Sequence, residues 1–253
     1  FTGIKIGYKG SSVGEVCFNT SMTGYQEIIT DPSYAGQIIN FTFPHIGNVG
    51  TNFDDNESRK SFAKGVIINC NISDPSNFRS IQHLDAWLKK KKIPGLCNVD
   101  TRALTNKIRN DGALKGGIAE ETNKNDLKIF KKEIKEWHGL NNLDLALEVT
   151  CKEKKILNKS TKSKLTIHAI DYWVKQNILN CLHNLNANIV VVPATTPSSV
   201  ILSYKPDGIF LSNGPGDPKA TGKYAVPIIK ELISNNIPIF GICLGHQLLS
   251  IAL

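Results

Sequence analysis

The carboxyl-terminal part of the chain alternates short, continuously apolar runs with segments whose apolar residues recur at helical spacing. Continuous apolar runs are typical of strands buried on both faces of a sheet, and their alternation with helices is typical of a parallel sheet. The pattern therefore predicts a parallel α/β sheet. Its expected strands are residues 165–170, 188–192, 208–211 and 237–242, and its expected helices are residues 175–185, 197–203 and 224–234.

The amino-terminal part has a different pattern, in which short β-type runs and turn clusters precede helical periodicity. In the first helical segment, Ile81, Leu84 and Leu88 are expected to share one face. Four lysines follow at its end, where positive charge suits the helix dipole. The pattern predicts a mixed α/β domain. Its expected strands are residues 14–18, 37–43 and 65–69, and its expected helices are residues 80–91, 101–109 and 125–137.

A polar, lysine-rich stretch without sustained periodicity separates the two parts. This composition is typical of a linker or an exposed connection. We therefore expect an amino-terminal domain over residues 1–150, a linker over residues 151–164 and a second domain over residues 165–253.

Composition narrows the class of protein. The 253 residues are 41% hydrophobic, which is enough to bury the cores of one large or two ordinary domains. No apolar run approaches the ~20 residues of a membrane span, and the first residues lack a signal-peptide pattern. We expect a cytoplasmic protein that does not bind membranes. The six cysteines form no C-x-x-C pair, which argues against a disulfide framework and against a zinc site.

The net charge of +8 raises the question of nucleic-acid binding. Only four of the 30 basic residues are arginines, although base and phosphate recognition favours arginine. No aromatic residues interleave with the lysine runs as a stacking surface would require. A solvated lysine-rich surface is the better interpretation, and we expect no nucleic-acid partner.

A β-type run meets a helical run within residues 237–253, and Cys243 lies at the junction. Gly241 and Gly245 flank it, where a sharp turn and close packing require backbone without a Cβ. This is the pattern of a nucleophile elbow. The helix N-terminus behind such a thiol favours the thiolate, and the amide of Leu244 is placed to face an oxyanion. The alternative is a buried structural cysteine that ends a strand.

The heptapeptide Gly-Ile-Cys-Leu-Gly-His-Gln at residues 241–247 resembles the nucleophile motif of class I glutamine amidotransferases. Residues 18–34, 44–52 and 99–105 resemble the amino-terminal domain of the small, glutaminase subunit of carbamoyl-phosphate synthase. The resemblance extends along the whole chain. It implies an α/β protein in which a flavodoxin-like parallel-sheet domain, incomplete at its carboxyl end, follows the mixed α/β domain.

The resemblance also implies roles for individual residues. Cys243 would be the nucleophile, and the amides of Leu244 and Gly214 would form the oxyanion hole. The residues expected to contact glutamine are Ser33, Gly214, Gly216, Leu244 and Gln247.

Blander interpretations stay open for two of these segments. Residues 212–218, which hold Gly214 and Gly216, read by themselves as a tight turn, and they lack the Gly-Lys-Ser/Thr of a P-loop. Ser33 reads by itself as a turn residue whose hydroxyl bonds its own backbone.

The family's catalytic His and acidic partner lie in a His-Pro-Glu stretch downstream of the nucleophile helix. None of the six histidines here matches that His, and His246 is expected to pack. The chain also begins at Phe1 without a methionine or the family's first strand, so we expect it to be cut at both ends. Trp173 stands where the family has a glycine, and it would be strained there if φ is positive. This leaves the local turn, and any role of Lys175, open.

The implied function of the parent protein is hydrolysis of L-glutamine through a cysteine thioester. The ammonia would pass to a large subunit that makes carbamoyl phosphate for the arginine and pyrimidine pathways. No metal or organic cofactor is expected in this chain, because ATP and Mg²⁺ serve the large subunit. One alternative is an inactive fragment that keeps a partner-binding surface. Another is a different class I amidotransferase, such as that of anthranilate or guanylate synthesis, against which the amino-terminal motifs count.

Overall fold

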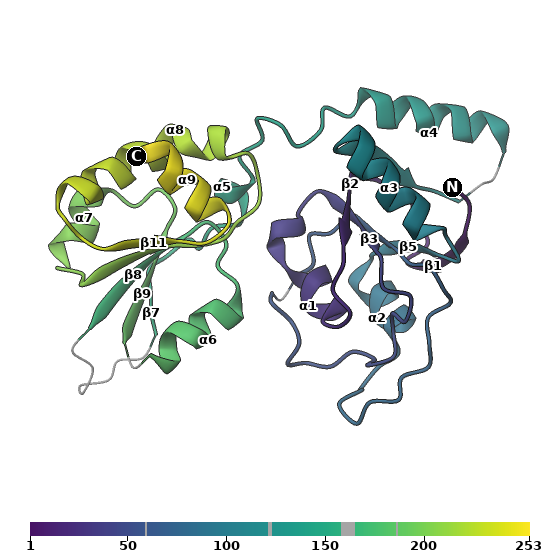
Figure 1. Ribbon diagram of the computed structural model, residues 1–253, viewed down its shortest axis with the longest axis horizontal. Coiled ribbons are helices and arrows are strands. Elements are labelled where there is room, and N and C mark those ends of the chain that lie inside the picture. The colour runs from purple at the N-terminus through teal and green to yellow at the C-terminus, as the bar shows by residue number, and fades with distance from the viewer. Residues whose placement is uncertain (59, 121–122, 158–164, 186) are drawn as a thin grey trace. The chain divides into compact units, whose positions relative to one another are not determined.

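The computed structural model describes residues 1–58, 60–120, 123–157, 165–185 and 187–253. The chain forms two compact units, Phe1–Gly139 and Leu140–Leu253, and each is described by itself (Figure 1).

The division between the units differs from the expected one. Helix α5 (Leu145–Val149) comes before residue 150, yet Ala146 is fully buried in the core of the second unit. Strand β7 (Lys155–Leu157) lies within the expected linker and pairs antiparallel with β9 (Asn188–Pro193). The sequence pattern did not predict this strand, because its composition is lysine-rich. An edge strand with one solvated face does not need a continuous apolar run. Residues 158–164 of the expected linker lie outside the described residues.

The described residues of the first unit form a six-stranded mixed sheet in the order β1-β5-β4-β3-β2-β6. The inner pairs are parallel, and the two edge strands β1 and β6 are antiparallel to their neighbours. The strands are β1 (Ile4–Gly7), β2 (Ser12–Asn19), β3 (Gln37–Phe41), β4 (Gly65–Ile67), β5 (Pro94–Cys97) and β6 (Leu114–Ile118).

Two buried clusters cover this sheet. One contains Ile29 and Leu88, from helices α1 and α2, and the other contains Leu104 and Ile108, from α3. The helices are α1 (Tyr25–Thr30), η1 (Pro32–Tyr34), α2 (Leu84–Lys91), α3 (Thr101–Asp111) and α4 (Lys124–Glu136).

Helix α2 begins later than the expected residue 80. His83 caps it, because its Nδ1 accepts the amide of Asp85 over 3.2 Å. Ile81 precedes the cap and is exposed, so the prediction that it shares the apolar helix face is wrong. Its neighbour Gln82 instead bridges to Thr51.

The described residues of the second unit form a five-stranded sheet in the order β11-β10-β8-β9-β7. Strands β8 to β11 are parallel, as expected. In chain order the parallel strands are arranged second, first, third, fourth, which is the flavodoxin-like order with its reversal between β8 and β10. The strands not yet bounded are β8 (Thr166–Asp171), β10 (Gly208–Leu211) and β11 (Ile239–Gly241).

Helices cover both faces of the second sheet (Figure 1). Helix α6 packs Leu179 on one face, and the core on the other face includes Ile201, Ile229 and Leu248. Helix α8 begins at Pro218, earlier than the expected residue 224, because Asp217 caps it and proline suits a first helical turn. The helices are α6 (Gln176–Asn184), α7 (Ser198–Ser203), α8 (Pro218–Ser234) and α9 (Leu244–Ala252).

Within these described ranges, no helix has the length and apolar character needed to cross a membrane.

Candidate active site

Cys243 lies at a sharp turn between β11 and α9 and occupies the cap position of the helix. Its backbone has φ 51° and ψ −115°, which residues with a Cβ rarely adopt. The amide of Gln247 donates to the Cys243 carbonyl over 3.0 Å, so the helix starts directly behind the cysteine. The thiol is exposed, which argues against a buried structural cysteine. The turn has the geometry of the expected elbow.

Two glycines allow the elbow to close. A Cβ on Gly245 would lie 2.2 Å from the carbonyl oxygen of Leu211, and a Cβ on Gly241 would lie 2.7 Å from the carbonyl oxygen of Gly245. Close approach of neighbouring backbone therefore requires both glycines. The Gly245 amide donates over 3.0 Å to the carbonyl of Ile242 and over 3.0 Å to that of Ser212. The second of these bonds ties the elbow to the loop after β10.

That loop carries the two glycines expected at the glutamine site. A Cβ on Gly214 would lie 2.1 Å from the carbonyl oxygen of Tyr172, so this backbone is in direct contact with the turn after β8. Gly216 has φ 101°, a conformation that favours glycine. The amides of Gly214 and Leu244 donate to no acceptor among the described residues, whereas the Gly245 amide is fully engaged. Both residues are buried, and neither amide is engaged by another described residue.

The turn after β8 is hydrogen-bonded to the same loop. The Tyr172 amide donates to Ser212 Oγ over 2.8 Å, and the Lys175 amide donates to Asn213 Oδ1 over 3.1 Å. Strands β8 and β10 flank the point where the strand order reverses, and α/β sheets bind ligands at such points. Ser212 and Asn213 were not predicted as functional residues from the sequence. The available signal was a pair of polar residues directly after a buried strand and before a glycine.

Trp173 has φ 94°, so the expected strain of a bulky residue at the family's glycine position is present. The Asp171 carboxylate holds this turn closed. Its Oδ1 accepts the amides of Trp173 and Val174 over 2.9 Å and 2.7 Å, and its Oδ2 accepts the amide of Cys151 over 2.7 Å. These three bonds stabilise a conformation that the tryptophan itself disfavours.

We assign neither His246 nor His168 of the second unit as the general base. His246 is exposed on α9, as is Gln247, so the expectation that His246 packs is wrong for the described residues. His168 is fully buried on β8, and neither of its ring nitrogens has a hydrogen-bond partner. Burial, and next the charge of Lys154, lower the pKa of His168 to about 4. His168 is therefore a neutral core residue.

Ser33 belongs to the first unit and lies half-buried in η1. Its amide donates to Asp31 Oδ1 over 2.9 Å, which is an aspartate-capped turn. The first and second units are described separately, so a contact between Ser33 and glutamine stays a prediction.

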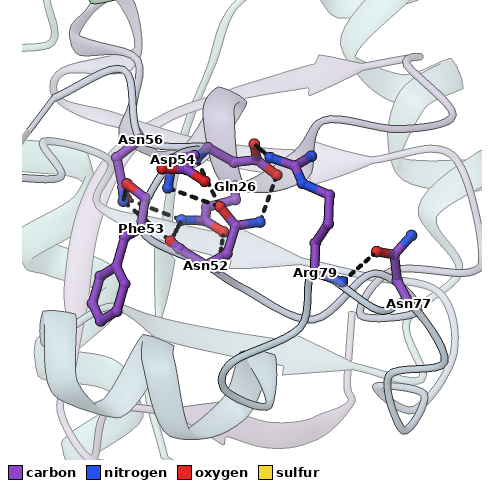
Figure 2. Close-up of polar contacts among 8 residues, drawn as sticks. Gln26, Asn52, Phe53, Asp54, Asn56, Asn77 and Arg79 are labelled. Atoms are coloured by element: carbon purple, nitrogen blue, oxygen red, sulfur yellow. Dashed lines mark hydrogen bonds and ion pairs between the residues drawn. The ribbon is translucent and has the colours of Figure 1, made fainter.

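Two segments that carry the resemblance, residues 18–34 and 44–52, meet in the first unit (Figure 2). The Gln26 side chain donates to the Asn52 carbonyl over 2.6 Å and accepts the Asn52 amide over 2.9 Å. The Asn52 side chain in turn donates to Asp55 over 2.8 Å, and Arg79 pairs with Asp55 over 2.5 Å. This network was not predicted from the sequence, because no local pattern links residues so distant along the chain.

Metal binding finds no support in these contacts. Across the described residues, no group of three or more His, Cys, Asp or Glu side chains is arranged to hold a metal ion.

The second unit therefore brings an exposed cysteine elbow after β11 together with a glycine loop after β10. Residues 168–253 match the family model "Glutamine amidotransferase class-I", so the second unit is a domain of that class. Residues 1–118 match "Carbamoyl-phosphate synthase small chain, CPSase domain".

Curated relatives extend the similarity to nearly the whole chain. The carbamoyl phosphate synthase small chain of Bradyrhizobium diazoefficiens is 52% identical, over 99% of this chain and 67% of its own length. The small chain of Agrobacterium fabrum is 51% identical over 99% of this chain and 67% of its own length. The small chain of Bartonella quintana is 54% identical over 97% of this chain and 66% of its own length. The chain therefore belongs to the carbamoyl phosphate synthase small chain family. It spans about two thirds of the length of these relatives.

Proposed function

We propose that the parent protein uses Cys243 to hydrolyse L-glutamine and to supply ammonia for carbamoyl phosphate synthesis. The hydrogen bond of 3.0 Å from the Gly245 amide to the Ser212 carbonyl carries this proposal, because it joins the elbow and the Gly214 loop. The exposed thiol of Cys243 and the amides of Leu244 and Gly214 then lie on two segments that are hydrogen-bonded to each other. Acyl transfer through a cysteine requires this combination.

The reaction follows from these groups. The Cys243 sulfur attacks the side-chain carboxamide carbon of glutamine, and the amides of Leu244 and Gly214 donate to the oxygen that becomes negative. The carbon–nitrogen bond then breaks, the nitrogen takes up a proton and leaves as ammonia, and a glutamyl thioester remains on Cys243. Water attacks the thioester and releases glutamate. The proton transfers require a positioned acid and base, which we assign to no described residue.

The substrate contacts of the proposal come from both units. Gly216 and Gln247 adjoin the loop and the elbow respectively, and Ser33 would reach glutamine from the first unit. The chemistry itself requires no metal or organic cofactor, since a thiol, amide donors and a protein acid and base can carry out each step.

The proposed partner is a large synthetase chain that consumes the ammonia with ATP and Mg²⁺. The first unit is the proposed docking surface, because the small-chain model matches residues 1–118 and Cys243 lies outside that range. A stable interface buries roughly 1,200–2,000 Å² in total, which a six-stranded unit with helices on its sheet is large enough to offer.

The deciding experiment compares two cysteines of the second unit in the complete enzyme. Cys243→Ser should abolish carbamoyl phosphate synthesis from glutamine and leave synthesis from added ammonia unchanged, because only the ammonia supply depends on the thiol. Cys181→Ser is the matched control, since Cys181 is also exposed but lies on α6. Equal loss of glutamine-dependent and ammonia-dependent synthesis in Cys243→Ser would refute the proposal.

A further inference from the structure

We infer that Ser212 and Asn213 are positioning residues that hold the Gly214 amide in register with Cys243. The inference rests on the proposed function and assigns how its oxyanion hole is kept in shape. Two hydrogen bonds, from the Tyr172 amide to Ser212 Oγ (2.8 Å) and from the Lys175 amide to Asn213 Oδ1 (3.1 Å), form what we call the loop clamp.

Both acceptor residues of the loop clamp are buried. The side chains of Ser212 and Asn213 are 0% and 2% exposed, and both follow β10 directly. A buried amide that loses its acceptor finds no water to replace it, so the surrounding backbone must shift. The buried bond of Tyr172 is therefore the stronger constraint on the loop, and the part-buried bond of Lys175 is the weaker one.

Ser212 connects three segments through three of its own groups. Its amide donates to the Ile170 carbonyl of β8 over 3.2 Å, and its hydroxyl accepts from Tyr172. Its carbonyl accepts the Gly245 amide of the elbow over 3.0 Å. A shift of Ser212 therefore moves the Gly214 loop and the elbow relative to each other.

The effect of the loop clamp should appear in the chemical step. Neither side chain is proposed to touch glutamine, and an oxyanion amide interacts more strongly with the transition state than with the substrate. A displaced Gly214 amide then lowers kcat with little change in KM. A side chain that only stabilised the fold would lower the amount of folded enzyme and leave kcat per folded molecule unchanged.

The first test removes one bond from the surface side. Lys175 has φ −62°, which proline adopts without strain, and it precedes the first residue of α6. Lys175→Pro deletes the amide hydrogen that Asn213 accepts, and Lys175→Ala retains it. We expect kcat for glutamine hydrolysis by the complete enzyme to be about 10-fold lower in Lys175→Pro than in Lys175→Ala. Equal kcat values in the two variants would overturn the role of Asn213.

The second test removes the Ser212 hydroxyl. Ser212→Ala should lower kcat about 10-fold or more with KM within about 2-fold, and Ser212→Thr, which keeps the acceptor, should recover most of the loss. Ser198→Ala is the control, because Ser198 is also a buried serine, hydrogen-bonded to Glu231 of α8 and outside the loop clamp. It should leave kcat unchanged.

Rates are expressed per folded molecule, with ammonia-dependent synthesis by the same preparation as the internal standard. Wild-type kcat in Ser212→Ala, or an equal loss in Ser198→Ala, would overturn the inference. If Ser212→Ala does not fold, the Lys175 pair decides alone. Failure of the proposed function itself is distinguishable, because it would appear as wild-type glutamine-dependent synthesis in Cys243→Ser.

Discussion

The carbonyl oxygen of Tyr172 occupies the space beside the Cα of Gly214, at 2.1 Å from where a Cβ would stand. No side chain fits there without displacing backbone. Gly214→Ala keeps the amide hydrogen, but the contact with Tyr172 means that the amide must be displaced.

We therefore predict that Gly214→Ala lowers glutamine-dependent turnover by about 100-fold, the cost of losing one oxyanion donor. Gly208→Ala, at the start of the β10 strand that leads into this loop, is the control, since its Cβ would meet nothing closer than 3.7 Å. Steady-state assays with glutamine and with ammonia check the pair. Wild-type turnover in Gly214→Ala would remove this residue from the site.

Because Trp173 has a positive φ, we expect replacement by glycine to give a more stable protein than replacement by alanine. At most positions the order is the reverse, but at φ 94° a Cβ is strained and glycine is not. We expect Trp173→Gly to exceed Trp173→Ala in free energy of unfolding by about 1 kcal/mol. Both variants lose the same indole ring, so their difference isolates the backbone term. Urea unfolding of the second unit, followed by pulse proteolysis, measures it, and the usual order would contradict the strain.

Because His168 is buried and neutral, we expect acid to destabilise the second unit. Its pKa is about 4 when folded and 6.5 as the ordinary value, so the unfolded chain binds the proton more readily. The stability that this group contributes is fully present above pH 6.5 and is lost as the pH falls towards 4. Between pH 7 and pH 5 the loss is up to about 2 kcal/mol.

The comparison variant is His168→Leu, which fills the same apolar site without titrating. Unfolding free energies of the two proteins at both pH values give the contribution of His168 by difference, since the other titrating groups are shared. An identical pH dependence in the two proteins would show that His168 is not kept neutral by burial.

Gln26 and Asn52 form two hydrogen bonds with each other, so we expect a substitution of Gln26 to reduce local protection from hydrogen exchange in the first unit. Gln26→Leu keeps the volume but removes the acceptor of the buried Asn52 amide, while the Asn52 carbonyl keeps the Asn56 side chain as a donor over 3.3 Å. The lost acceptor costs about 2 kcal/mol. Hydrogen exchange in peptides covering residues 44–56 should accelerate accordingly. Arg79→Ala should change exchange little, because its ion pair with Asp55 is partly exposed, with 41% and 15% of the two side chains accessible. Unchanged exchange in Gln26→Leu would mean that other contacts hold the loop.

Local chemistry determined much of this protein. The apolar runs predicted the parallel strands of the second unit, because strands buried on both faces tolerate no polar alternation. The elbow around Cys243 was also predicted from the sequence, since glycines on both sides of a cysteine at a strand–helix junction indicate a sharp, closely packed turn. For Trp173 the sequence predicted strain only if φ is positive, and the structure supplied that φ.

Tertiary structure decided what depends on contacts between distant segments. The strand within the expected linker exists only because β9 offers it a partner, and α5 joins the second unit through Ala146. The severity expected of Gly214→Ala, the loop clamp and the pairing of Gln26 with Asn52 all depend on backbone groups brought together by the sheets. A sequence records which groups can donate or accept a hydrogen bond, but their partners are chosen by packing, which acts across segments that no local period connects.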